Sequence, residues 1–133
     1  MKHALSLSWG YGSGGPGRGG NRRITEWSEV DEVLEGVRYN SGAAILEIVS
    51  TQSNGPKNVD VRADRGRYLL TLLEYTEDDS DVRSFTNPDA EPGRVEIFGD
   101  YWGSNMITSD FSVVREVFRQ FFETGDVSRD LLD

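Results

Sequence analysis

The sequence predicts an α+β domain in which one antiparallel sheet of five or six strands, connected as a meander, packs against two α-helices. Most of the chain consists of short apolar or alternating segments separated by turn residues, which is typical of strands. Two further segments repeat their apolar residues every three or four positions, which indicates helices. The length of 133 residues, with no cysteine, fits one hydrophobic core, so we expect residues 1–133 to form a single domain.

The first strand and the segment after it differ in composition. Residues 3–9 alternate, with Leu5, Leu7 and Trp9 on one face of the expected strand. Residues 10–20 read GYGSGGPGRGG and predict a flexible loop, because they offer few side chains to a core. Their glycines match the letters of a dinucleotide-binding motif, but no helix opens on them, so nucleotide binding is not expected.

The chain then predicts a short returning strand at residues 22–25 and the first helix. Ser28 is expected to cap this helix, since serine favours the N-cap position, and acidic residues fill the first turn. Its apolar positions lie on one stripe, and the helix is expected to end at residues 40–42. The stripe comprises Val30, Val33, Leu34 and Val37.

A run of strands follows the first helix. We expect three of them, separated by residues 53–56 and by a tight hairpin at residues 64–66. An acidic turn, a weak strand, a proline-containing loop and a stronger strand complete the meander. In order, these segments are residues 43–50, 58–63, 67–75, 76–81, 82–86, 87–93 and 94–99.

The C-terminal helix has the clearest periodicity of the chain. Ser109 or Asp110 is expected to cap it, and Gly125 is the natural C-terminal stop. Four phenylalanines fall on its apolar stripe, which we interpret as the face that docks on the sheet and not as a cofactor site. The stripe is Phe111, Val114, Val117, Phe118, Phe121 and Phe122.

The net charge of −9 is unevenly distributed. Residues 1–42 carry five basic and five acidic residues, whereas residues 43–133 carry nine basic and eighteen acidic residues. Such a surface repels phosphate backbones and attracts basic proteins. We therefore expect a protein partner with a basic surface, and no direct binding of nucleic acid.

Few residues predict enzyme chemistry. The one histidine, His3, has no partner that the sequence identifies, and the acidic run 77–81 lacks the glycine and glutamate of a calcium loop. No nucleophile or phosphate-binding motif is present, so we expect no cofactor and no metal. An acid–base pair among the eighteen C-terminal carboxylates stays open, because such pairs form in space and not in sequence.

The segment from Arg94 to the C-terminus resembles the C-terminal half of the type-one immunity proteins of bacterial polymorphic toxin systems. That family ends in a strand, a loop and a helix carrying an aromatic pair before a T-G turn, where this chain has Phe121-Phe122 and Thr124-Gly125. Members often close with a tryptophan, where this chain has Leu132-Asp133. The resemblance implies an inhibitor that binds a cognate toxin, commonly of the nucleic-acid deaminase superfamily. The acidic charge predicts that the inhibitor occludes the toxin's active site, because carboxylates can take the place of phosphates in a positive groove.

Two segments are candidate partner-binding sites. Asp100, Tyr101 and Trp102 place aromatic anchors beside a carboxylate on an expected loop bounded by glycines. The alternative for Trp102 is a place at the edge of the core. The second candidate is the acidic turn, whose alternative role is solubility alone. Its candidate residues are Glu77, Asp78, Asp79 and Asp81.

The leading hypothesis is thus a non-enzymatic immunity protein that neutralises a DNA cytosine deaminase. The alternatives are a small acidic ligand-binding or hydrolytic domain, which requires a deep pocket with converging carboxylates, and a regulatory subunit without a toxin. No cysteine, export signal or long apolar run is evident, so we expect a cytoplasmic protein without a membrane segment.

Overall fold

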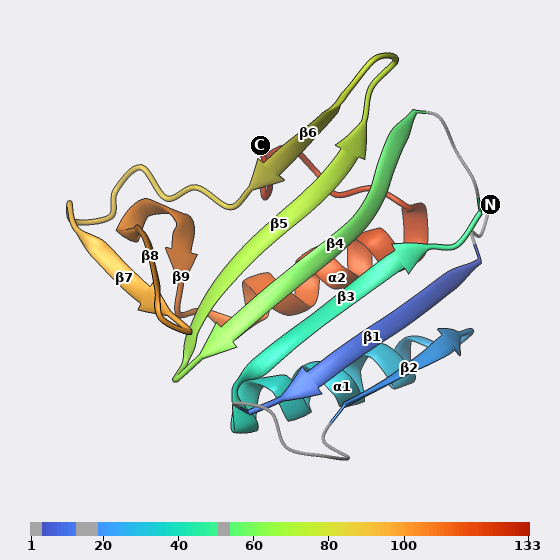
Figure 1. The fold of residues 1–133 in the computed structure, drawn as a ribbon, viewed down its shortest axis with the longest axis horizontal. Helices are drawn as coiled ribbons and strands as arrows, with labels where there is room; N and C mark the ends of the chain where they lie inside the picture. The colour runs from blue at the N-terminus through green and yellow to red at the C-terminus, as the bar shows by residue number, and fades with distance from the viewer. Residues whose placement is uncertain (1–3, 13–18, 51–53) are drawn as a thin grey trace.

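The computed structural model describes residues 4–12, 19–50 and 54–133, and in it two helices cover one face of an antiparallel sheet (Figure 1). Six strands follow one another across this main sheet in the order β2-β1-β3-β4-β5-β6, and the short β9 (Ile107–Thr108) also pairs with β5. The predicted α+β class and two helices are confirmed. The six strands are β1 (Leu5–Tyr11), β2 (Gly19–Ile24), β3 (Gly42–Ile48), β4 (Gly55–Asp64), β5 (Arg67–Tyr75) and β6 (Ser80–Ser84).

The glycine-rich segment contributes to both strands of the first hairpin. Gly10 and Tyr11 belong to β1, whereas Gly19 and Gly20 begin β2, so the loop expected at residues 10–20 is shorter than predicted; residues 13–18 lie outside the described part. The glycines permit close pairing, because a Cβ at Gly20 would lie 2.6 Å from the Trp9 ring. The strand expected at residues 22–25 therefore begins earlier than predicted.

Helix α1 (Trp27–Asn40) begins earlier than the sequence predicts. Its N-cap is Glu26 and not Ser28, since the Glu29 carboxylate accepts the backbone N–H of Glu26 at 3.1 Å. A glutamate three residues after the cap thus replaces the hydroxyl cap that we expected. The expected stripe of α1 is buried as predicted.

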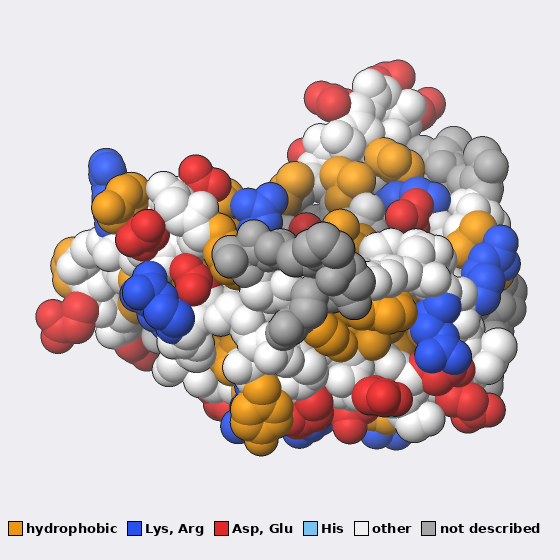
Figure 2. All heavy atoms as spheres, turned by 60° about the horizontal axis from the view of Figure 1, so that its bottom comes forward, with side chains coloured by type: hydrophobic (Ala, Val, Ile, Leu, Met, Phe, Trp, Pro, Cys, Tyr) orange, Lys and Arg blue, Asp and Glu red, His pale blue; other side chains and the backbone are white. Residues whose placement is uncertain are grey.

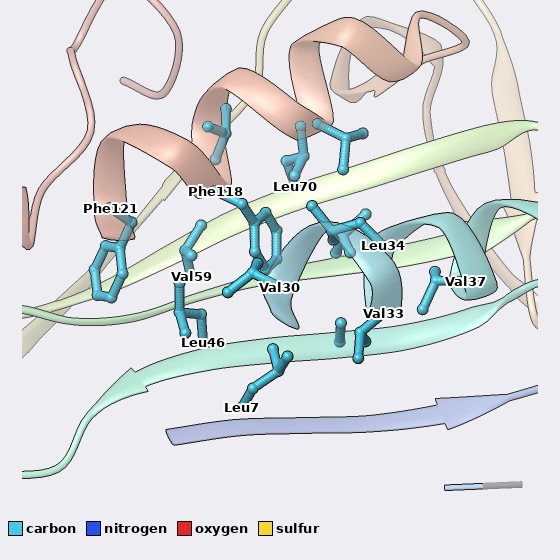
Figure 3. Close-up of a cluster of buried hydrophobic side chains, with 14 of the residues drawn as sticks. Leu7, Val30, Val33, Leu34, Val37, Leu46, Val59, Leu70, Phe118 and Phe121 are labelled. Atoms are coloured by element: carbon cyan, nitrogen blue, oxygen red, sulfur yellow. The ribbon is translucent and has the colours of Figure 1, made fainter. Parts of the chain in front are cut away.

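Helix α2 (Phe111–Thr124) packs its aromatic stripe against the same face of the sheet. Asp110 caps it by accepting the backbone N–H of Ser112 at 3.0 Å, and Gly125 ends it with a left-handed φ of 79°. Phe118 and Phe121 are fully buried beside α1 and the sheet (Figure 3). Phe122 is only half-buried and packs on Trp27, with ring centroids 5.9 Å apart.

The strand expected at residues 94–99 does not continue the meander. β7 (Arg94–Ile97) instead pairs with β8 (Asp100–Gly103) in a separate two-stranded sheet, so the loop expected at residues 100–102 is a strand. This β7–β8 hairpin packs on the face of the main sheet opposite the helices, where Ile97 and Leu69 are 1% and 2% exposed. A 3-10 turn (Ser104–Met106) then leads through β9 back to β5.

The C-terminal residues fold back along the edge strand β6. Arg83 of β6 is buried and donates to the carbonyl oxygens of Val127 at 2.5 Å and Leu132 at 3.1 Å. Asp133 exchanges two backbone hydrogen bonds with Ser84, each 3.2 Å long. These contacts pair the outer edge of β6 with the chain's own C-terminus.

Candidate functional site

The face of the main sheet opposite the helices, here called the open face, carries apolar, basic and acidic side chains side by side. Because side chains alternate along a strand, residues two apart in β3, β4 and β5 point to it. In register across these strands, Ala43, Arg62 and Leu69 form one row. Ile45, Asp60 and Thr71 form the next row.

Two projections border the open face. The acidic turn between β5 and β6 lies at one end of β5, and the β7–β8 hairpin lies at the other (Figure 1). The nine residues of β5 separate them by about 25–30 Å. In Figure 2 these projections, here called the lobes, lie at the upper right and at the left. The upper right lobe ends in acidic side chains, the left lobe carries both acidic and basic side chains, and apolar and basic side chains lie between the two.

The four predicted acids of this segment, Glu77, Asp78, Asp79 and Asp81, are all exposed. Glu77 and Asp78 lie in the turn between β5 and β6. Asp79 shapes the turn, because its carboxylate accepts the backbone N–H of Ser80 at 2.8 Å and its own N–H donates to Thr76 Oγ1 at 3.2 Å. Asp81 is already in β6 and shares the helix side of the sheet with Arg83, so it does not point to the open face.

The second predicted cluster is divided between the two sides of the β7–β8 hairpin. Tyr101 is 66% exposed and Asp100 is exposed. Trp102 is half-buried and faces the sheet, with its ring centroid 5.9 Å from the guanidinium carbon of Arg62. Its indole N–H is buried and finds no acceptor among the described residues. Trp102 therefore holds the hairpin on the sheet, while Tyr101 faces outward. Asp100 shares the side of Trp102 and Ile97 but is exposed, because it lies next to the turn.

Sequence reasoning missed Phe98, which lies at the tip of this hairpin and is 43% exposed. Phe98 and Gly99 are the two turn residues, and both have positive φ, 49° and 87°. Their conformation matches a tight hairpin of the type that favours Asn-Gly. The Phe98-Gly99 pair between two alternating segments could have predicted this two-residue hairpin turn. It was missed because a bulky residue with positive φ is unusual.

The tip is fixed to the main sheet by a buried carboxylate. Asp64 Oδ2 accepts the backbone N–H of Phe98 at 3.0 Å, and Asp64 Oδ1 lies 3.3 Å from Nε of Arg65. Arg65 and Gly66 form the turn between β4 and β5, also with positive φ, so the tight hairpin expected at residues 64–66 is confirmed. One side chain thus joins the tips of two hairpins.

The charges of the lobes are available to a partner, whereas most basic groups are occupied. Eight basic residues of the described part form ion pairs with acids of the chain, namely Arg22, Arg38, Lys57, Arg65, Arg83, Arg115, Arg119 and Arg129. Asp64 at the hairpin tip pairs with Arg65, but six acids of the lobes form no ion pair with a described residue, namely Glu77, Asp78, Asp79, Asp81, Glu96 and Asp100. The hairpin lobe also carries the exposed Arg94 of β7, which forms no ion pair with a described residue, so its excess of acids is one, whereas the acidic turn carries negative charge alone.

Asp60 is a carboxyl in the middle of the open face with an altered pKa. Burial raises its pKa above the usual range, although Arg62 and a hydrogen bond from Thr71 act in the opposite direction. The residues paired with it, Ile45 and Thr71, are not acidic. Asp60 therefore lacks a neighbouring carboxylate in register.

We expect Asp60→Asn to increase the free energy of unfolding at pH 7. A raised pKa in the folded state means that folding disfavours the ionised carboxyl, so the penalty grows as pH rises through the unfolded value of about 3.9. Urea denaturation of both proteins should give the variant the higher midpoint at pH 7, and the difference should shrink at pH 3.5. Asp89→Asn, at an exposed acid, is the control. An increase in the urea midpoint that is the same at pH 7 and pH 3.5 would contradict the expectation.

A shallow hollow of about 190 Å³ lies next to Asp60, whose cross-strand neighbour Ile45 lines it. It is lined by Ser8, Trp9, Gly10, Ala43 and Ile45, none of which is a carboxylate.

Within residues 4–12, 19–50 and 54–133, no cluster of three or more His, Asp or Glu side chains is placed to hold a metal ion. No helix in that part is long and apolar enough to cross a membrane. The candidate residues Glu77, Asp78 and Tyr101 are exposed, so the candidate site is an exterior surface.

Comparisons with known proteins bear on the fold and the family. Residues 8–131 match the family described as a family of unknown function (DUF6911). A solved structure, described as the crystal structure of a hypothetical protein from Neisseria gonorrhoeae, superposes with a TM-score of 0.74 at 15% identity, covering 94% of this chain and 90% of that one. No curated protein matches significantly. The structural similarity supports the fold described above.

Proposed function

The chain belongs to the DUF6911 family, and since that family's description gives no activity, we propose from the surface that it is an immunity protein that neutralises a secreted bacterial toxin. The toxin acts on nucleic acid, and binding occludes its active site. The protein itself catalyses no reaction in this role. It works in the cytoplasm of the producing cell, where the toxin is made.

The observation that carries the proposal is the excess of acids without ion pairs on two lobes that border a concave face (Figure 2). A toxin that acts on nucleic acid presents a positive groove to phosphates. Carboxylates on two projections, about 25–30 Å apart, suit the occupation of both rims of such a groove. An inhibitor of this kind competes with nucleic acid by covering the groove.

The class of toxin follows from the resemblance to type-one immunity proteins. Their partners are commonly nucleic-acid deaminases, so the proposed target is a deaminase of cytosine in DNA. The charge argument alone requires only a basic nucleic-acid-binding protein. The two parts of the proposal can therefore be tested separately.

The direct test is inhibition. The purified chain is titrated into the toxin encoded by the neighbouring gene, and deamination of cytosine in DNA is followed. Activity should fall to zero at an equimolar ratio. Full activity at stoichiometric excess contradicts the proposal, and tight binding without inhibition contradicts occlusion.

Neutralising the lobes should slow association. We expect the triple variant Glu77→Gln, Asp78→Asn, Asp100→Asn to lower the association rate constant about tenfold at low salt and to weaken its salt dependence, because exposed charges act mainly through steering. Stopped-flow fluorescence at several ionic strengths measures both effects.

The control variant changes the net charge equally but away from the open face. Glu32→Gln, Glu116→Gln and Asp130→Asn alter exposed acids on α1, on α2 and in the C-terminal segment. Their effect on the association rate should be clearly smaller. Equal slowing by both triples would show that only net charge matters and that the lobes have no special role.

A further inference from the structure

We infer that the β7–β8 hairpin is a preorganised anchor that inserts Phe98 and Tyr101 into an apolar pocket rimmed by basic groups on the partner protein. The inference rests on the proposed function and names the element of the chain that makes the tightest contact. Four features of the hairpin support it.

The conformation of Phe98 is unfavourable for folding. A bulky residue with φ of 49° costs roughly 1–2 kcal/mol, and asparagine or glycine is the usual residue at this place of a tight turn. The ring is 43% exposed, so burial of the side chain in the monomer offsets little of that cost. A strained, exposed aromatic residue at a fixed tip is characteristic of a functional site.

The hairpin is held rigidly, so little order needs to be gained on binding. Asp64 accepts the N–H of Phe98, and Ile97 is buried against the sheet. On the same side, Trp102 packs over Arg62. An aromatic residue fixed before the encounter loses less conformational entropy in a complex, which increases affinity.

The chemistry around Phe98 defines the partner surface. Tyr101 is 66% exposed, and its cross-strand neighbour is Glu96. Asp100 lies just beyond the tip, and neither acid forms an ion pair among the described residues. Glu96 lies beside Tyr101 on the outer side of the hairpin, and Asp100 lies next to the turn on the other side. Two exposed aromatic side chains with a free carboxylate on either side of the hairpin suit a pocket with apolar walls and lysine or arginine side chains at its rim.

The test separates the ring from the turn. Phe98→Asn removes the ring but supplies a residue that adopts positive φ more readily, so the melting temperature should stay the same or rise. Isothermal titration with a catalytically inactive form of the toxin encoded by the neighbouring gene should show an affinity roughly thirtyfold weaker or more, mainly through faster dissociation. Tyr39→Ala removes an exposed aromatic residue on α1 and should leave the affinity unchanged.

Each outcome decides a different point. Toxin binding by the wild-type chain with equal affinity for Phe98→Asn overturns the anchor and leaves the proposed function standing. Failure of the wild-type chain to bind overturns both. If Phe98→Asn lowers the melting temperature by several degrees, Tyr101→Ala decides the question, and unchanged affinity in that variant overturns the anchor.

Discussion

Replacing Arg83 by methionine is expected to lower the free energy of unfolding by about 3 kcal/mol, since removing one partner of a buried, hydrogen-bonded ion pair is strongly destabilising. Nη1 of Arg83 lies 3.0 Å from the Glu74 carboxylate and 2.9 Å from that of Asp126. Nε and Nη2 donate to the backbone carbonyls of Leu132 and Val127. Methionine fills the space of the stem but leaves these carbonyls without their donor.

The effect should appear in two measurements. The melting temperature should fall by roughly 10 °C, given a shift of about 3–4 °C per kcal/mol for a domain of this size. Limited proteolysis should cleave residues 126–133 earlier than in the wild type, because the guanidinium ties that segment to β6. Arg23→Met, at an exposed residue of β2, should change stability by less than about 0.5 kcal/mol. Equal stability of both variants would mean that the Arg83 network contributes nothing net.

Elements whose signals are local could be predicted from the sequence. The stripe of α2, its Asp110 cap and its Gly125 stop all lie within one segment, and β5 has the predicted bounds. A run of strand-like segments after the first of two helical stripes then predicted the α+β class. The start of α1 was missed because a Glu26 and Glu29 pair can replace a hydroxyl cap, and sequence alone does not rank the two.

Features set by contacts between distant segments could not be predicted. An alternating segment such as 94–97 pairs equally well with a sheet edge or with its own hairpin partner, and burial of Ile97 against the sheet face decides the outcome. The side of the hairpin on which Trp102 lies depends on Arg62, which is forty positions earlier. For the candidate site, the sequence located Tyr101 and the acidic turn but could show neither the exposure of Phe98 nor the ion pairs that occupy the basic residues.

Gly42→Ala is expected to be the most damaging single-methyl substitution at a glycine of the main sheet. Gly42 has a φ of 138°, and an added Cβ would lie 2.1 Å from the carbonyl oxygen of Gly10. Because that neighbour is backbone in the adjacent strand β1, relief requires the two strands to move apart. Strain and overpacking together should cost about 3 kcal/mol or more, measured as the loss of the urea midpoint.

Gly66→Ala separates the two contributions, because it retains the conformational cost and removes the clash. Gly66 also has positive φ, 78°, but nothing lies within 4 Å of its added Cβ. Gly66→Ala should lower the free energy of unfolding by about 1 kcal/mol, which is the expected cost of positive φ alone. Equal losses at the two positions would show that β1 yields easily to the methyl group. A much larger loss at Gly42 would show that the spacing of β1 and β3 is rigid, so that the scaffold which presents the two acidic lobes and the Phe98 tip is fixed before any partner arrives.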